Sequence, residues 1–398
     1  MALRRRYYAY RATTFPGFVF PIGTLFLLAR DLSFTGIATA GAVGIAVGVL
    51  GEVPTGYVAD RLGRRNTLVA AAVAHTLAQA GYLLVWSVPA AAVVVSVSAL
   101  AESLQSGTLD AWLYDVLADR GEGDEYTAVF GRGESIRHYA GAVMLIAAGP
   151  LYAADVTYPF YAMAVVNAAS VLALLFLPEA AVHEDDESFS VRQAAATIRG
   201  ALWSRHLRSY VLYAALATAV IRVSMEYLQP IAVDALAFLP GDPAASIGVL
   251  YAAFTVLSAA ASDRAAAVRD RLGVRAILLG GPLLTACLFA AVAFAPWLAL
   301  PAFVVMRPTG AVVRAVRSRY LNARIDSVGR ATVMSAAALA FSTVRFPLLL
   351  GAGVVADAFD PYVALSAVSG TFLVAAAVLW LVEVPIRAAH ASDAALAD

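Results

Sequence analysis

Apolar stretches of about 20 residues recur along this chain from one end to the other, and they limit its fold more than any other feature. A stretch of that length crosses the hydrocarbon core of a bilayer as a helix, whereas a barrel strand needs only about 9–11 alternating residues. Of the 398 residues, 61% are hydrophobic and 14% are charged, while soluble domains carry about 25% charged residues. The sequence therefore predicts an all-α integral membrane protein.

About twelve such stretches can be delimited, with a polar break after the sixth. We expect an N-terminal six-helix half over residues 1–178, a cytoplasmic linker with an amphipathic helix over 179–206, and a C-terminal six-helix half over 207–398. The linker helix, which carries arginines and Trp203, is suited to the lipid headgroup region. The predicted spans are 8–30, 34–59, 67–86, 89–118, 127–153, 157–178, 207–236, 243–262, 274–295, 297–321, 331–356 and 361–384.

The placement of arginine predicts the orientation of these spans. Most arginines of the connecting segments fall on one side of the twelve-span layout, whereas the opposite turns carry Arg30 together with several aspartates. Segments rich in positive charge stay in the cytoplasm, so both termini are expected there. We predict a multi-pass protein of the plasma membrane, without evidence in the sequence for oligomers.

A short charged motif occurs once in each half. Asp60-Arg61-Leu62-Gly63-Arg64-Arg65 is echoed 210 positions later as Asp270-Arg271-Leu272-Gly273-Val274-Arg275. Two similar halves in a chain this apolar are typical of secondary transporters, in which one half rocks against the other to give alternating access.

The stretch from Gly56 to Arg65 resembles the signature loop between helices 2 and 3 of the major facilitator superfamily. Glu52-Val53-Pro54-Thr55 and Arg330-Ala331-Thr332-Val333 are similar to motifs of its drug:proton antiporter-like subset. The resemblance implies twelve transmembrane helices in two pseudo-symmetric six-helix halves, the major facilitator fold. It also implies that the loop is a gating latch, formed by Gly56, Asp60, Arg61, Gly63, Arg64 and Arg65.

Within this latch, the resemblance places Asp60 against the start of helix 11, near Gly329–Ala331, where helical N–H groups favour an anion. It also implies that Arg61 or Arg64 pairs with Asp115 or Asp119 at the end of helix 4. Gly63 permits a tight turn, and Gly56 is expected to let helix 2 approach a neighbour closely. The alternative is that the arginines only fix the topology.

Charges inside the spans are candidates for the transport site, because a buried charge costs about 2.5–3.5 kcal/mol unless it has a partner, water or a function. On a continuous fourth helix, Glu102 and Asp110 share one face with Gln105 and Ser106. Glu102 would lie nearest the midplane, where a carboxylate can carry a proton. The alternative for both acids is a static ion pair, and Arg137 is expected to reach Asp110.

Three further charges in the C-terminal half complete the predicted substrate and proton site. Arg222 and Glu226 are four residues apart, so they can neutralise each other on one helix or contact substrate. Arg307 is followed by Pro308, which frees a carbonyl group and suits a polar or anionic ligand.

Several motifs are absent from the sequence. It has no Gly-x-x-x-x-Gly-Lys loop for ATP, no Cys/His spacing for a metal and a single cysteine, Cys287. We therefore predict no enzyme, no cofactor and no metal, and the zero net charge argues against nucleic acid. The leading function is proton-coupled efflux of a small amphipathic molecule by a monomer. The main alternative is transport of an organic anion bound by buried arginines, and the distant one is a membrane sensor on the same fold.

Overall fold

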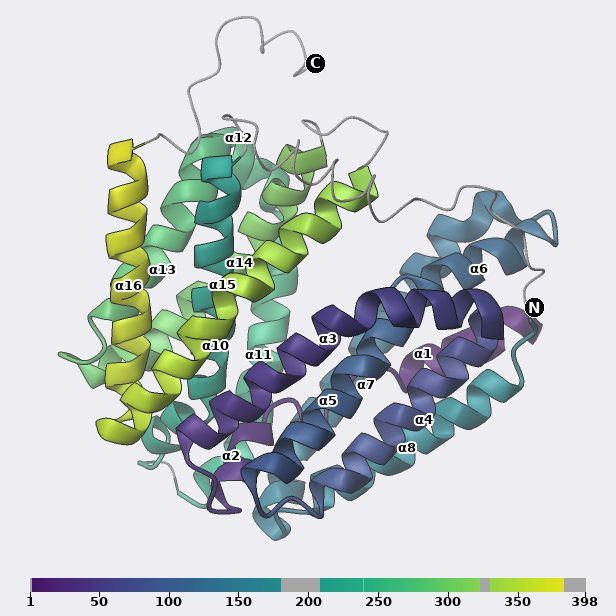
Figure 1. The fold of residues 1–398 in the computed structure, drawn as a ribbon, viewed down its shortest axis with the longest axis horizontal. Helices are drawn as coiled ribbons and strands as arrows, with labels where there is room; N and C mark the ends of the chain where they lie inside the picture. Colours follow the sequence, from purple (N-terminus) through teal and green to yellow (C-terminus); the bar gives the residue numbers. More distant parts are fainter. Residues whose placement is uncertain (1, 180–207, 239, 323–329, 383–398) are drawn as a thin grey trace, which may run out of the picture. The chain divides into compact units, whose positions relative to one another are not determined.

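The computed structural model describes residues 2–179, 208–238, 240–322 and 330–382, and all regular structure in these residues is helical (Figure 1). In a bilayer every backbone N–H and C=O group must find its partner within the segment, which explains why long apolar sequences fold into helices. The helices follow the predicted spans in order, which confirms the predicted fold class. The predicted linker, residues 179–206, lies outside the described residues apart from Glu179.

The described residues form short and long helices that follow one another along the chain. They are α1 (Ala2–Ala12), α2 (Gly23–Leu28), α3 (Phe34–Leu62), α4 (Arg64–Tyr82), α5 (Val88–Gln105), α6 (Thr108–Ala118), η1 (Gly123–Glu125), α7 (Tyr126–Ala154), α8 (Tyr158–Leu175), α10 (Arg208–Ala235), α11 (Pro243–Asp263), α12 (Ala265–Arg275), η2 (Ala276–Gly280), α13 (Gly281–Ala290), η3 (Pro296–Leu298), α14 (Ala299–Asn322), α15 (Arg330–Ala358) and α16 (Pro361–Val382).

Nine stretches of the described residues are long and apolar enough to cross a membrane. The predicted spans 8–30, 67–86 and 127–153 are not among them. In α7 the reason is its charge, since this helix carries Arg132, Glu134 and Arg137.

The first predicted span, residues 8–30, is wrong as a continuous helix. The α1 helix ends at Ala12 and α2 begins at Gly23. Pro16 and Pro21 lie between them, and a proline lacks the N–H that a continuing helix needs. The chain crosses this gap in turns, one of which is closed by a 2.9 Å bond from Phe20 N to Pro16 O.

The fourth predicted span, residues 89–118, is also interrupted. The α5 helix ends at Gln105, Ser106 is extended, and Gly107 has φ 72°, a left-handed conformation that glycine adopts without steric cost. The α6 helix then begins at Thr108. Glu102 and Asp110 therefore lie on two helices, and the expectation that they share a face of one helix is wrong.

The described helices form two compact units. The first comprises Met1–Asp186, Glu226–Thr255 and Leu349–Pro361, and the second comprises Glu187–Met225, Val256–Leu348 and Tyr362–Asp398. In the first unit α3 packs along α5, α4 packs against α5 and α8, and α1 packs against α7. In the second unit α12 and α13 pack against α14. The division into halves at residues 178 and 207 stays a prediction.

Within the first unit, α7 and α11 touch through their backbones. A Cβ atom on Gly149 would overlap the carbonyl oxygen of Ala245, and one on Gly248 would overlap that of Leu145. Glycine at both positions allows a helix contact that no larger residue permits.

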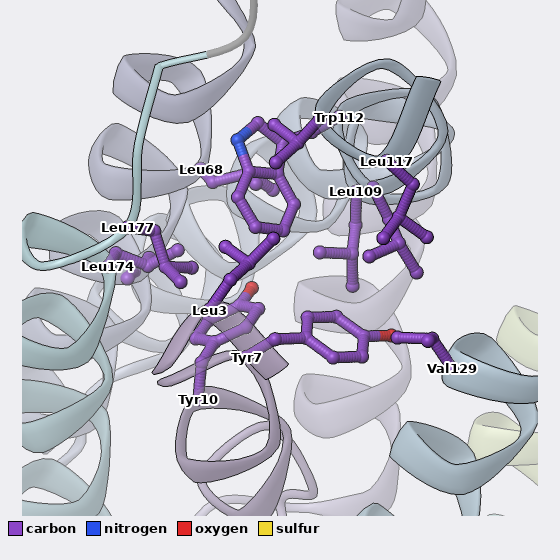
Figure 2. Close-up of a cluster of buried hydrophobic side chains, with 13 residues drawn as sticks. Leu3, Tyr7, Tyr10, Leu68, Leu109, Trp112, Leu117, Val129, Leu174 and Leu177 are labelled. Carbon is purple, nitrogen blue, oxygen red and sulfur yellow. The ribbon is translucent and has the colours of Figure 1, made fainter. Parts of the chain in front are cut away.

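A buried apolar cluster fixes α1 against α4, α6 and α8 (Figure 2). At its centre the indole of Trp112 is fully buried and stacks on the ring of Tyr7, with 6.2 Å between centroids. Its Nε1 donates a 3.0 Å hydrogen bond to the carbonyl oxygen of Pro178. The cluster therefore brings side chains of α1 and α6 into contact, and Arg11 and Asp110 lie on these two helices.

Candidate functional site

A pocket of about 320 Å³ lies within the first unit, among α1, α5, α6 and α7. It begins where α5 ends, and the non-helical residues Ser106 and Gly107 form part of its wall. Both the size and the mixture of charges suit a small polar or amphipathic ligand. Its lining residues are Arg11, Thr14, Glu102, Gln105, Ser106, Gly107, Leu109, Asp110, Glu134 and Arg137.

One side of the pocket is an ion-pair network centred on Glu134 of α7. The Nη2 atom of Arg11 pairs with Glu134 Oε1, and Nε and Nη2 of Arg137 both lie 3.0 Å from Glu134 Oε2. His138 lies 3.8 Å from the same carboxylate. The guanidinium of Arg11 is only 5% exposed, so the pair with Glu134 compensates its burial.

Arg137 does not reach Asp110, contrary to the prediction. It binds Glu134, which precedes it by three residues on the same helix and is therefore a nearer partner. Arg11 and Glu134 were not predicted as site residues, although each is a charge inside a predicted span and could have been recognised on that ground.

The pocket lining also includes two further carboxylates, Glu102 on α5 and Asp110 on α6. Both side chains are exposed, and neither forms an ion pair with another residue in the described part of the chain. Between them Gln105 donates a 3.0 Å hydrogen bond from Nε2 to the hydroxyl of Tyr10. A carboxylate without a fixed partner can accept a proton or a cation, so these two acids differ in kind from Glu134.

The signature loop forms a turn and two sets of side-chain contacts in the first unit. Gly63, with φ 78°, turns the chain between α3 and α4. Arg64 forms an ion pair with Asp115 of α6, which is one of the partners that the resemblance implied. Arg65 donates to the carbonyl oxygens of Leu174 and Leu175 at the end of α8, at 3.1 and 2.6 Å.

The remaining loop residues make none of these contacts with α6 or α8 among the described side chains. The guanidinium of Arg61 lies 4.3 Å from the ring centroid of Tyr57. A Cβ atom on Gly56 would meet no atom within 4 Å, so the close approach expected there is not found among the described residues. The side chain of Asp60 and the segment at Gly329–Ala331 lie outside what the structure describes at side-chain level.

The other predicted site residues lie on helices that do not line this pocket. Arg222 and Glu226 are one turn apart on α10, as their spacing requires. Arg307 lies on α14 beside Pro308, with Nη1 4.0 Å from the sulfur of Met225. Of the six predicted substrate and proton residues, the pocket therefore brings together Glu102, Asp110 and Arg137.

The ion pair between Arg64 and Asp115 is expected to show energetic coupling. Their side chains are 31% and 13% exposed, so part of the attraction is screened by solvent. We expect Arg64→Gln and Asp115→Asn each to lower the free energy of unfolding by about 1 kcal/mol, and the double variant to lose less than the sum. A double-mutant cycle by chemical denaturation measures this, and strictly additive losses would show that the pair contributes nothing.

Comparison with known proteins gives three findings. The family model described as Major Facilitator Superfamily matches residues 12–342. A protein of Bacillus subtilis (strain 168), described as the uncharacterized MFS-type transporter YxaM, is 27% identical over 150 residues, which span 38% of this chain and 37% of that protein.

Among solved structures, the nucleoside transporter NupG aligns with a TM-score of 0.77 at 14% identity, covering 95% of this chain and 97% of that one. A bacterial homolog of the human lysosomal transporter Spinster, in an inward-facing and unoccupied conformation, aligns with a TM-score of 0.72 at 13% identity, covering 96% and 95%. A D-xylose–proton symporter aligns with a TM-score of 0.63 at 14% identity, covering 95% of each chain. At such low identity these likenesses show the fold alone.

Proposed function

The chain belongs to the Major Facilitator Superfamily and is a multi-pass membrane transporter, and from that premise we propose that it exports a small amphipathic compound from the cell in exchange for protons. Members of this family are transporters rather than enzymes. In this proposal the protein resides in the plasma membrane with both termini in the cytoplasm, and cargo moves by alternating access as the two halves rock.

One observation carries the proposal: the pocket holds two acids without a fixed counter-ion beside a third that two arginines neutralise. Glu102 and Asp110 are available to a proton or a cationic group, whereas Glu134 is committed to Arg11 and Arg137. A proton and a cationic cargo compete for the same carboxylate, and this competition is the simplest basis for exchange. Glu102 is the first candidate for that acid, and Leu109 adds apolar surface to the pocket.

The loop from Asp60 to Arg65 would act as a latch in this cycle. Its support is the pair between Arg64 and Asp115 together with the contacts of Arg65 at the end of α8. Such contacts can hold α4, α6 and α8 together while other parts of the chain move.

Proton flux in proteoliposomes tests the proposal. Purified protein is reconstituted, a pH gradient is imposed, and lipophilic cations are added, followed by organic acids. We expect a cation to dissipate the gradient faster than in protein-free liposomes, because each exchanged cargo returns protons. A panel without any response would leave proton coupling unsupported.

Transport of an organic anion is a second candidate, favoured by the presence of Arg11 and Arg137 in the same pocket. A carboxylate on the cargo could bind one of these guanidiniums in place of Glu134. The same panel separates the two functions, because an anion transporter would respond to the organic acids and not to the cations.

A further inference from the structure

A second charged site lies in the second unit, where α10 and α14 are joined by a side-chain hydrogen bond. Arg317 of α14 donates from Nη1 to the hydroxyl of Thr218 on α10, at 2.8 Å. The guanidinium of Arg317 also lies 5.2 Å from the ring centroid of Phe341 on α15. Arg317 is therefore held in place and half-buried, with donors to spare beyond the one that Thr218 accepts.

Two more arginines lie beside this junction. Arg222 follows Thr218 by four residues on α10, and Arg314 precedes Arg317 by three residues on α14. Residues at these spacings are neighbours on one side of a helix. The positive charges of Arg314 and Arg222 both act on Arg317. Three guanidiniums thus gather where α10 and α14 meet.

Two of the three arginines lack an acidic partner among the described residues. Glu226 follows Arg222 by one turn on α10 and can compensate it, but neither Arg314 nor Arg317 forms an ion pair with an acid in the described part of the chain. Like charges on membrane helices repel one another, and a guanidinium without a partner is costly there. An anion that bound among them would relieve both penalties.

We propose that Arg222, Arg314, Arg317 and Thr218 form a binding site for an oxyanion, the carboxylate or phosphate group of a ligand. Guanidinium groups present paired N–H donors that match these groups, and a threonine hydroxyl adds a further donor. The ligand is a small organic acid or phosphate, or the headgroup of an anionic lipid. The site is separate from the pocket in the first unit and does not depend on proton coupling.

Binding to protein in nanodiscs tests this site. The full chain is placed in discs of phosphatidylcholine, and succinate and inorganic phosphate are titrated while the melting temperature is followed. We expect one of them to raise the melting temperature in a saturable manner. Arg317→Gln and Arg314→Gln should each weaken this binding by about tenfold or more, the usual effect of losing a charge-assisted hydrogen bond. Arg319→Gln, an exposed arginine on the same helix, is the matched control and should leave the affinity unchanged.

A second set of discs containing phosphatidylglycerol distinguishes the source of the oxyanion. Stabilisation by this lipid alone, lost in Arg317→Gln and kept in Arg319→Gln, would support the site with a headgroup as its ligand. The absence of stabilisation by either source would overturn the proposal, as would equal losses in Arg317→Gln and Arg319→Gln. Arg314→Gln carries the test if Arg317→Gln does not fold, which the melting temperature without ligand reveals.

Discussion

Replacing Glu102 by glutamine is expected to abolish proton-driven transport while leaving exchange of cargo at equal pH largely intact. Glutamine keeps the size and hydrogen-bonding capacity of the side chain but cannot take up or release a proton. In proteoliposomes, accumulation driven by a pH gradient should fall to the level of protein-free vesicles. The exchange rate of the variant should also lose the pH dependence shown by the wild-type protein.

Glu122→Gln is the matched control for this prediction. Glu122 lies outside the spans and binds Arg4 at 2.7 Å, and this bond holds the pKa of its carboxyl below the usual range. Glu122 therefore stays ionised at neutral pH. Its contribution to the stability of the folded state is lost only as the pH falls through that lowered pKa. Its replacement should leave coupling unchanged. If Glu102→Gln still accumulated cargo under a pH gradient, Glu102 would not be the coupling acid.

Trp112→Ala is expected to be the most destabilising single change in the first unit. The indole is fully buried in the cluster of Figure 2, and truncating a buried tryptophan costs about 3–5 kcal/mol through lost contacts and the cavity left behind. The variant also leaves the Pro178 carbonyl without the donor that it has in the wild-type protein. Denaturation in detergent, followed by circular dichroism, measures the loss.

Two further variants make this prediction specific. Trp297→Ala removes an indole that is 75% exposed and should cost less than 1 kcal/mol, roughly the range of surface substitutions. Trp112→Phe keeps most of the apolar volume and should give an intermediate loss. Equal destabilisation by Trp112→Ala and Trp297→Ala would contradict the role assigned to the cluster.

The order of the helices could be predicted from the sequence because each span must contain enough apolar residues to cross the bilayer. The resemblance also gave Asp115 and Asp119 as possible partners of Arg61 or Arg64, and the ion pair between Arg64 and Asp115 is one of these combinations. These features depend on local composition and on the resemblance of one loop. They do not require knowledge of how helices pack.

The interior of the site was less predictable. The first span contains Pro16 and Pro21 and could have been divided on that ground, whereas the fourth is interrupted at Gly107 without a proline. Glu134 pairs with Arg137, as their spacing on one helix allows, but its pair with Arg11 depends on the packing of α1 on α7 and cannot be read from spacing. The arginines near Thr218 come from two helices distant in sequence, and they form a cluster because α10 and α14 meet there.

The interruption at Ser106 and Gly107 also affects the distance between the carboxylates of Glu102 and Asp110. Glu102 and Asp110 are carried by two separate helices, and Ser106 and Gly107 between them have non-helical backbone conformations. A rotation about the backbone bonds of Gly107 would move one carboxylate relative to the other without unfolding α5 or α6. The separation of the two acids, and with it their mutual repulsion, is thus an adjustable quantity rather than a constant of the fold.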